Sequence, residues 1–319
     1  MESKNLIPVF FAIDDAYAPL LGVALKSIII NASKKRNYKV IIIQENVSDT
    51  NQRKLLSLAN ENFDIEIISM GKSLENITDR SENRLRCDYF TMTIFFRLFI
   101  PEMFPEYDKC LYLDSDIVVP GDISELYDTD VQNYLIAACP DYSSSDVPPL
   151  INWMENAVGV DRHKYVNSGI LVMNLKKLRE VKLEEHFMHL LNTYHFDCIA
   201  PDQDYLNAMC KGQIFFLDES WDVMPNPRRK EHPAPKLIHY NLFEKPWCYD
   251  NIQYADYFWK YAEMSDFYAQ VKEIKDNYSE EQKLRDEQSF NLLIQKAKTV
   301  PDTGVTFVKM GKENVKIKL

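Results

Sequence analysis

Strand-like apolar runs alternate with segments of helical periodicity at the start of the chain. The apolar runs span Leu6–Ile13, Lys39–Ile43 and Asp64–Ile68. Between them, Pro19–Ile30 and Ser48–Ala59 carry apolar residues at the spacing of an amphipathic helix. This strand–helix–strand–helix–strand order is how a mainly parallel sheet with helices on both faces begins. The pattern therefore predicts an α/β fold.

The alternation is less regular further along the chain. A helix is predicted over Thr91–Ile100, followed by a buried strand that ends at Asp114. Later strands are expected at Tyr134–Cys139, Ser168–Met173, Gln213–Leu217 and Lys236–Tyr240, and helices at Leu183–Tyr194 and Asp202–Met209. From about Asn251 the pattern predicts only polar helices. This change divides the chain into a domain over residues 1–250 and a helical extension over residues 251–319.

Two aspartates at the end of the buried strand are the most informative residues. Asp114 and Asp116 are one residue apart, and in extended chain such side chains project to the same side. Converging carboxylates repel each other unless a cation binds them, so the pair predicts a metal site. The alternative is a turn in which Asp114, Ser115 and Asp116 bond to local backbone N–H groups. Asp14 and Asp15 also follow a strand, so both acidic pairs are expected to face one crevice.

Composition narrows the function classes. The 319 residues include 48 acidic and 37 basic side chains, and a net charge of −11 argues against non-specific nucleic-acid binding. Six scattered cysteines without a Cys-x-x-Cys pair are expected to be reduced core residues. The eight glycines form no phosphate-binding motif, so a metal held by carboxylates is the expected way to neutralise a bound diphosphate. No signal peptide or membrane span is indicated, and a cytoplasmic protein is expected.

Several segments, taken in order, resemble the retaining glycosyltransferases of family 8, which include bacterial lipopolysaccharide galactosyl- and glucosyltransferases and glycogenin. The resemblance covers roughly residues 6–250. Its segments are Phe11-Ala12-Ile13-Asp14-Asp15-Ala16-Tyr17, Arg97, Tyr112-Leu113-Asp114-Ser115-Asp116, Tyr165-Val166-Asn167-Ser168-Gly169-Ile170-Leu171-Val172-Met173-Asn174-Leu175, Asp202-Gln203-Asp204-Tyr205-Leu206-Asn207, and His239 with Lys245-Pro246-Trp247. It implies the GT-A nucleotide-diphospho-sugar transferase fold, a Rossmann-like mixed sheet, here with a C-terminal helical extension.

The resemblance also implies a metal site. Asp114, Asp116 and His239 would hold a divalent cation that bridges the two phosphates of a sugar nucleotide. Oxygen and imidazole ligands with open positions suit manganese, with magnesium as the alternative. Lys245 would reach the diphosphate and Arg97 the nucleotide sugar. Other roles stay open: a satisfied histidine near the surface, an exposed lysine, and a salt bridge that satisfies a buried arginine.

The donor-binding residues implied by the resemblance come from several segments. Asp14 would read the uracil, although capping of the next helix is an alternative role. Asp202 would bond to the hydroxyls of the donor sugar, with a helix cap after Pro201 as its alternative. The implied UDP-sugar set is Ala12, Asp14, Tyr17, Arg97, Ser115, Asn167, Ser168, Asp202, Gln203 and Lys245.

Gln203, Asp204 and Asp141 are the candidate catalytic residues. A covalent retaining route needs a carboxylate at the reacting face of the sugar, for which Asp204 or Asp141 is available. The resemblance also allows a front-face route, with Gln203 nearest the reacting carbon, and we favour it. Two positions depart from the family pattern, because Ala16 replaces a usual asparagine and Leu242 a usual glycine. Ala16 weakens a ribose contact, and Leu242 casts doubt on a phosphate contact that needs close backbone approach.

These features predict a metal-dependent retaining hexosyltransferase. It would transfer glucose or galactose from a UDP-sugar to a saccharide acceptor of cell-surface or lipopolysaccharide type. The alternatives are a sugar-nucleotide-binding protein without turnover and a nucleotidyltransferase. Residues 296–319 carry six lysines and two acidic residues. This tail is expected either to be solvated surface or to contact the inner face of the membrane peripherally.

Overall fold

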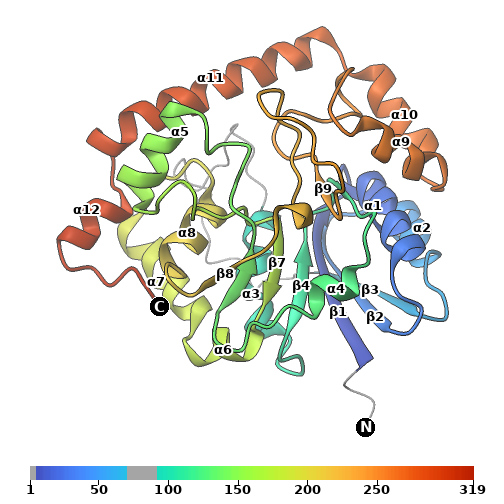
Figure 1. The fold of residues 1–319 in the computed structure, drawn as a ribbon, viewed down its shortest axis with the longest axis horizontal. Helices are drawn as coiled ribbons and strands as arrows, with labels where there is room; N and C mark the ends of the chain where they lie inside the picture. The colour runs from blue at the N-terminus through green and yellow to red at the C-terminus, as the bar shows by residue number, and fades with distance from the viewer. Residues whose placement is uncertain (1–4, 70–91) are drawn as a thin grey trace.

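The computed structural model describes residues 5–69 and 92–319, which fold around a seven-stranded sheet (Figure 1). The strand order is β3-β2-β1-β4-β7-β6-β8. Neighbouring strands pair in parallel except where β7 meets β4 and β6. The strands are β1 (Leu6–Asp14), β2 (Asn37–Glu45), β3 (Phe63–Ser69), β4 (Cys110–Leu113), β6 (Ile136–Ala138), β7 (Ile170–Met173) and β8 (Ile214–Phe216). The predicted α/β fold with a mixed sheet is confirmed.

Helices cover both faces of the sheet because successive strand residues point to opposite sides. In β1, Phe10 enters one apolar core, while Val9 and Phe11 enter the other. The core around Phe11 is closed by α1 (Ala18–Asn31), α2 (Asp49–Leu56) and α4 (Ile123–Tyr127). The core around Phe10 is closed by α3 (Phe96–Met103), α5 (Pro148–Trp153), α6 (Leu175–Glu180), α7 (Leu183–Tyr194) and α8 (Pro201–Met209).

The predicted elements agree with the structure in place and differ at their ends. Ser48 caps α2 by accepting a hydrogen bond from the Asn51 N–H. In place of the helix predicted over Thr91–Ile100, a 3-10 turn over Met92–Phe95 precedes α3, which runs on to Met103. Thr91 and Cys87 lie outside the described residues. Strand β7 begins at Ile170, two residues later than predicted, because Ser168 and Gly169 form the loop that enters the site.

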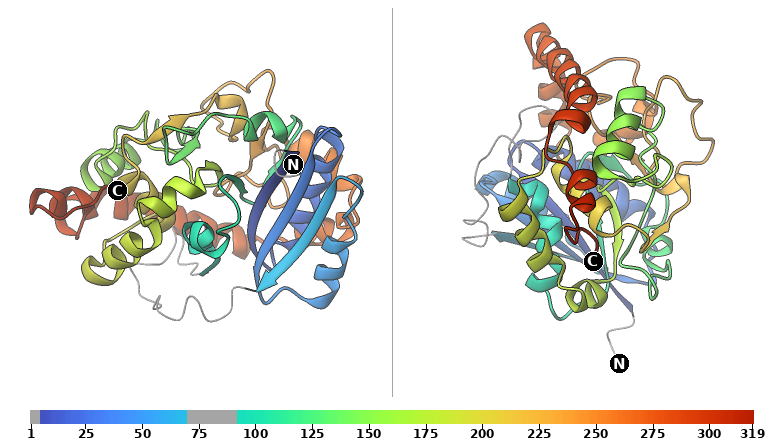
Figure 2. Two further views of the ribbon diagram at one scale, coloured as in Figure 1. Left: turned by 90° about the horizontal axis from the view of Figure 1, so that it is seen from below. Right: turned by 90° about the vertical axis from the view of Figure 1, so that its left-hand side faces the viewer.

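The chain after residue 251 is helical, as predicted, and forms α9 (Ala255–Glu263), α10 (Tyr268–Asn277), α11 (Glu280–Thr303) and α12 (Phe307–Lys312). Phe258 and Tyr261 of α9 pack with Leu20 and Val23 of α1 in a third apolar cluster. Helix α11 begins with a capping box between Ser279 and Gln282 and lies along α5. Figure 2 shows these helices reaching both ends of the sheet, with α9 and α10 against α1 at the β1–β3 end and α12 at the opposite end. Over residues 5–69 and 92–319, the helices are too short or too polar to cross a membrane.

Candidate functional site

Asp114 and Asp116 lie in a bend between β4 and β5 (Ile117–Val118), so the prediction that both project from one extended strand is wrong. Tertiary hydrogen bonds hold the bend. The Asp114 N–H donates to the Gly169 carbonyl at 2.7 Å, and the Tyr240 N–H donates to the Asp116 carbonyl at 2.9 Å. The two carboxylates bond to side chains distant in sequence, so the local capping role does not describe them.

His239 completes a cluster with these aspartates. It lies in β9 (Ile238–His239), which pairs with β5 in a small antiparallel sheet that sets His239 opposite Ile117. The His239 Nε2 atom is 3.3 Å from Asp116 Oδ1 and 3.8 Å from Asp114 Oδ2. One ligand atom from each of the three residues lies within 4.8 Å of the others. Two carboxylates and one imidazole at this spacing fit a divalent transition metal.

Gly169 provides the space in which the cluster forms. A Cβ atom at this position would lie 2.5 Å from His239 Cε1 and 2.6 Å from Asp114 Oδ2. Any side chain there would push the histidine and the aspartate apart. The glycine of the Asn167-Ser168-Gly169 segment is therefore needed by the cluster on steric grounds.

Asp222 is a site residue that the sequence analysis missed. Its fully buried carboxylate lies 3.1 Å from His239 Nδ1. A carboxylate at one ring nitrogen fixes the orientation of the imidazole and leaves the other nitrogen facing a metal. Burial raises the pKa of Asp222 to about 6, although the contact with His239 opposes that shift. Because 17 residues separate Asp222 from His239, no local motif links them.

Arg97 is buried and fully engaged. Its guanidinium lies 3.0 Å from Asp114 and 3.2 Å from Asp202. It also donates to the backbone carbonyls of Ser168 at 2.6 Å and Ile94 at 3.2 Å. Burial opposes the charge, but the two aspartates outweigh it and raise the pKa of Arg97. The salt bridge considered as an alternative therefore exists, and it joins the Asp114 bend to α8.

Lys245 is the second cation of the cluster. Its Nζ atom lies 2.6 Å from Asp116 Oδ2 and donates to the Tyr240 carbonyl at 2.8 Å. The side chain is 15% exposed, so Lys245 is not an ordinary surface lysine. Burial opposes its charge, but Asp116 outweighs burial and raises the pKa of Lys245.

The strand ends and the bend surround one small pocket of about 140 Å³. Its lining includes the predicted residues Ala12, Asp14, Tyr17, Arg97, Asp114, Ser115 and Asp116. Asp14 therefore lines the same pocket as Asp114 and Asp116, as expected. Asp15 instead accepts hydrogen bonds from Ser48 and Asn51 at the start of α2. Asp14 also accepts a hydrogen bond from the Tyr17 N–H at 3.1 Å, and so orders the turn that leads into α1.

The predicted donor-sugar residues form a buried network beside Arg97. Ser168 donates its hydroxyl to Asp202 at 2.8 Å and its N–H to Gln203 at 3.2 Å. The Gln203 amide donates to Asp141 at 2.9 Å. The side chain of Asn167 accepts a hydrogen bond from the Gly169 N–H at 2.7 Å. The alternative role of Asp202 as a helix cap is wrong, because α8 begins one residue earlier and the carboxylate points to Ser168 and Arg97.

Asp204 occupies a different environment from the other candidates. It is fully buried, and its oxygens accept hydrogen bonds from Trp153 at 3.1 Å and Tyr165 at 2.5 Å. They also accept from the backbone N–H groups of Ile199 and Ala200, both at 3.0 Å. This carboxylate holds the start of α8 against α5, which is a structural function.

Comparison with known proteins identifies one family of enzymes. The family model described as glycosyl transferase family 8 matches residues 8–251, and the chain belongs to that family. A Haemophilus influenzae protein is 27% identical to this chain. The match covers 71% of this chain and 65% of the length of that protein.

An Escherichia coli lipopolysaccharide 1,2-glucosyltransferase is 28% identical over 77% of this chain and 74% of its own length. The crystal structure of the galactosyltransferase LgtC in complex with donor and acceptor sugar analogs superposes with a TM-score of 0.67. LgtC shares 22% sequence identity with this chain. The superposition covers 88% of this chain and the whole of LgtC. The predicted GT-A fold is confirmed.

Proposed function

We propose that the protein is a metal-dependent retaining hexosyltransferase. It transfers glucose or galactose from a UDP-sugar to a saccharide acceptor of cell-surface or lipopolysaccharide type. The observation that carries the proposal is the Asp114–Asp116–His239 cluster, which adjoins the pocket formed by the strand ends. Family membership and the lipopolysaccharide 1,2-glucosyltransferase of E. coli support the choice of reaction.

The positions of the site residues support a separate role for each group of them. Asp114, Asp116 and His239 would hold Mn²⁺, or Mg²⁺ as the alternative, which when bound would offset the charge of the UDP leaving group. Ala12, Asp14, Tyr17 and Ser115 line the side of the pocket proposed for the nucleoside. Arg97 and Lys245 would donate to the diphosphate end, and Asn167, Ser168, Asp202 and Gln203 would bind the donor sugar.

The hydrogen bonds around the candidate carboxylates favour a front-face route. The Asp204 carboxylate accepts hydrogen bonds from four donors in the protein interior. Asp141 bonds to Gln203 and to Ser143. A nucleophile for a covalent route would have to break these contacts. We therefore place Gln203 nearest the reacting carbon and give Asp141 the task of orienting its amide.

The chain is proposed to consist of a catalytic domain over residues 1–250 and a helical extension over residues 251–319. The family match, which ends at residue 251, supports this boundary. We place the protein in the cytoplasm. Contact of the lysine-rich tail with the inner face of a membrane remains part of the proposal.

Release of UDP from a panel of UDP-sugars tests the proposal. UDP-glucose or UDP-galactose should release UDP in the presence of Mn²⁺, and EDTA should abolish that release. Equal UDP release in EDTA and in Mn²⁺ would contradict the proposed metal dependence. UDP binding without release from either sugar would instead indicate a non-catalytic binding protein. Formation of pyrophosphate from UTP and a sugar 1-phosphate would indicate a nucleotidyltransferase.

A further inference from the structure

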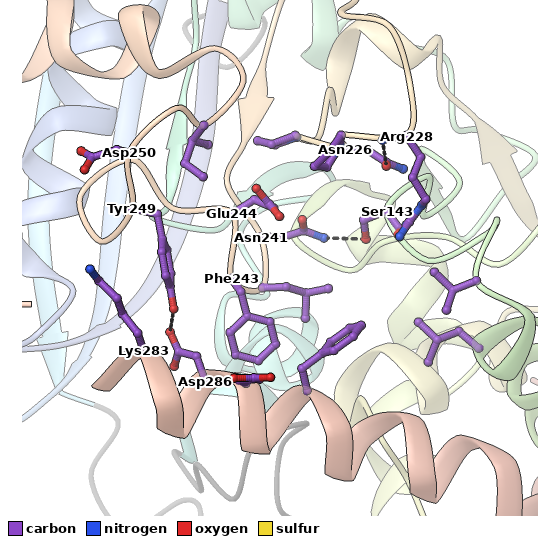
Figure 3. Close-up of a pocket in the computed structure, with 18 residues that line it drawn as sticks. Ser143, Asn226, Arg228, Asn241, Phe243, Glu244, Tyr249, Asp250, Lys283 and Asp286 are labelled. Atoms are coloured by element: carbon purple, nitrogen blue, oxygen red, sulfur yellow. Dashed lines mark hydrogen bonds between the residues drawn. The ribbon is translucent and has the colours of Figure 1, made fainter. Parts of the chain in front are cut away.

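A second and larger pocket lies between the proposed catalytic domain and α11. Its volume is about 550 Å³, within the range of about 300–1,000 Å³ typical of small-molecule sites. Figure 3 shows α11 along one side, the segment from Asn241 to Asp250 above it, and Ser143 and Arg228 on the far side. The pocket is thus formed jointly by the family-matching part of the chain and the extension.

Aromatic side chains form the wall next to α11. The rings of Phe243 and Phe290 meet edge to face with centroids 6.1 Å apart. The Tyr249 hydroxyl donates to Asp286 of α11 at 2.7 Å (Figure 3). The Tyr278 hydroxyl donates to the same carboxylate at 2.5 Å. These bonds hold α11 over the segment that contains Phe243. Phe290 is 36% exposed, so part of its ring is accessible to a ligand.

Polar groups with hydrogen-bonding capacity line the rest of the pocket. The Glu244 carboxylate is half-buried, and within the described part of the chain it has no hydrogen bond or ion pair. Arg228 is held in place by Asp146 at 2.9 Å and by the Ser143 carbonyl at 3.2 Å. A pyranose presents an apolar C–H face and a rim of hydroxyls. The aromatic wall matches the apolar face, and the Glu244 carboxylate and the Asn241 amide match the hydroxyls.

A chain of hydrogen bonds joins this pocket to the proposed reaction centre. Asn241 donates to the Ser143 hydroxyl at 3.1 Å, and that hydroxyl donates to Asp141 at 2.5 Å. Asp141 in turn accepts from the amide of Gln203. Asn241 is also only two residues from His239 of the metal cluster. The pocket is therefore linked through Ser143 and Asp141 to Gln203, one of the residues proposed to hold the donor sugar.

We propose that α11 forms the outer wall of the saccharide-acceptor site, with Phe290 and Glu244 determining which acceptor binds. The inference rests on the proposed function for the identity of the ligand class. The C-terminal extension thereby becomes part of the acceptor site, and it contributes Phe290, which lies outside the segment that matches the family model.

The test measures binding directly, so that it does not depend on turnover. Saturation-transfer NMR is recorded with para-nitrophenyl β-glucoside, β-galactoside and β-lactoside, with UDP and Mn²⁺ present. At least one glycoside should bind the wild-type protein, and Phe290→Ala should raise its dissociation constant about tenfold. Glu244→Gln should weaken the same complex. Leu284→Ala is the matched control, because Leu284 is a 52% exposed residue of α11 outside the pocket lining.

Two results would overturn the inference. One is the absence of saturation transfer to every glycoside with the wild-type protein. The other is wild-type affinity in both Phe290→Ala and Glu244→Gln. Melting temperatures of the variants separate a local effect from unfolding. Release of UDP from UDP-sugars is measured separately without acceptor, so failure of the proposed function is distinguishable from failure of this inference.

Discussion

Asp114 and Asp116 are each paired with a cation supplied by the protein. Lys245 lies 2.6 Å from Asp116, and Arg97 lies 3.0 Å from Asp114. The mutual repulsion expected from the sequence is therefore offset before any metal binds. Removing Asp116 leaves Lys245 without its carboxylate, and removing Asp114 leaves Arg97 with Asp202 alone, so neither variant should be more stable than the wild type.

Asp114→Ala and Asp116→Ala should each lower UDP release at least about a hundredfold, because loss of a metal ligand removes several kcal/mol of charge stabilisation. Circular dichroism should show that both variants remain folded. Asp15→Ala is the control, because Asp15 bonds to the start of α2 and should retain turnover. Activity above about a tenth of wild type in either ligand variant would contradict the metal assignment.

Arg97→Lys should impair turnover although it conserves charge. The guanidinium bonds at once to two carboxylates and two backbone carbonyls, and a single ammonium cannot reach all four. The lost hydrogen bonds should cost about 1–3 kcal/mol of unfolding free energy. Urea titration and UDP-release rates measure the two effects. If the variant matched the wild type in both stability and UDP-release rate, only the positive charge of Arg97 would matter.

Asp222→Asn should weaken Mn²⁺ binding by about 10–100-fold, as is typical when the partner of a metal-binding histidine is altered. The substitution keeps the shape of the side chain and removes its charge from His239 Nδ1. Calorimetric titration with Mn²⁺ in the presence of UDP measures the change. Asp218→Asn, in the same segment but at an exposed position, serves as the control. Unchanged Mn²⁺ affinity in Asp222→Asn would argue against metal binding through His239.

Sequence alone could name the cluster residues but not all of their contacts. Asp114, Asp116 and His239 belong to ordered motifs, so the family resemblance identified them. Asp222 belongs to no motif and acts through a contact 17 residues along the chain. Likewise, Asp202 was expected at the donor sugar and Asp204 in catalysis, yet only Asp202 points toward Arg97, because burial and direction depend on tertiary packing.

At the scale of elements, the long strands and helices were predictable because their periodicity is intrinsic to the sequence. Strands β5 and β9 have two residues each, and only β9 lies within a predicted strand, the one expected over Lys236–Tyr240. They exist because the Asp114 bend and the segment after Val223 pack together. This short sheet places His239 beside Asp116, and the sequence predicted the strand that carries His239 but not its pairing with β5.

Leu242 shows how the loop after β9 tolerates a departure from the family pattern. Its φ angle is +54°, in the left-handed region that favours glycine. The backbone conformation expected for glycine is therefore kept, at a cost of roughly 1–2 kcal/mol for a residue with a Cβ atom. The side chain of Leu242 lines the larger pocket beside Asn241.

Leu242→Gly should consequently be more stable than Leu242→Ala. Both variants lose the leucine contacts, but only alanine retains the strained Cβ atom. The expected difference in unfolding free energy is about 1 kcal/mol in favour of glycine. Urea denaturation midpoints compare the two variants. A more stable alanine variant would show that the left-handed conformation at this position carries no strain.

At the scale of the whole molecule, the proposed nucleotide and metal sites share their charged groups. Lys245 is bonded to Asp116, and Arg97 to Asp114. Binding of a diphosphate would draw these cations toward its own oxygens and free the carboxylates for a metal. The bound metal would in turn offset repulsion between the diphosphate and the aspartates. UDP and Mn²⁺ should therefore bind cooperatively, each raising the affinity for the other by the same factor.

UDP and Mn²⁺ together should stabilise the fold much more than either alone. A ligand at about 100 times its dissociation constant adds roughly 2.7 kcal/mol to the folded state. For a chain of this size, that corresponds to a rise in melting temperature of roughly 5 °C or more. His239→Ala should reduce the coupling, because it removes a metal ligand and leaves Asp14 and Arg97 to contact the nucleotide. Calorimetric UDP titrations in Mn²⁺ and in EDTA measure the coupling directly. Equal UDP affinities in the two buffers would rule out a metal that bridges the diphosphate.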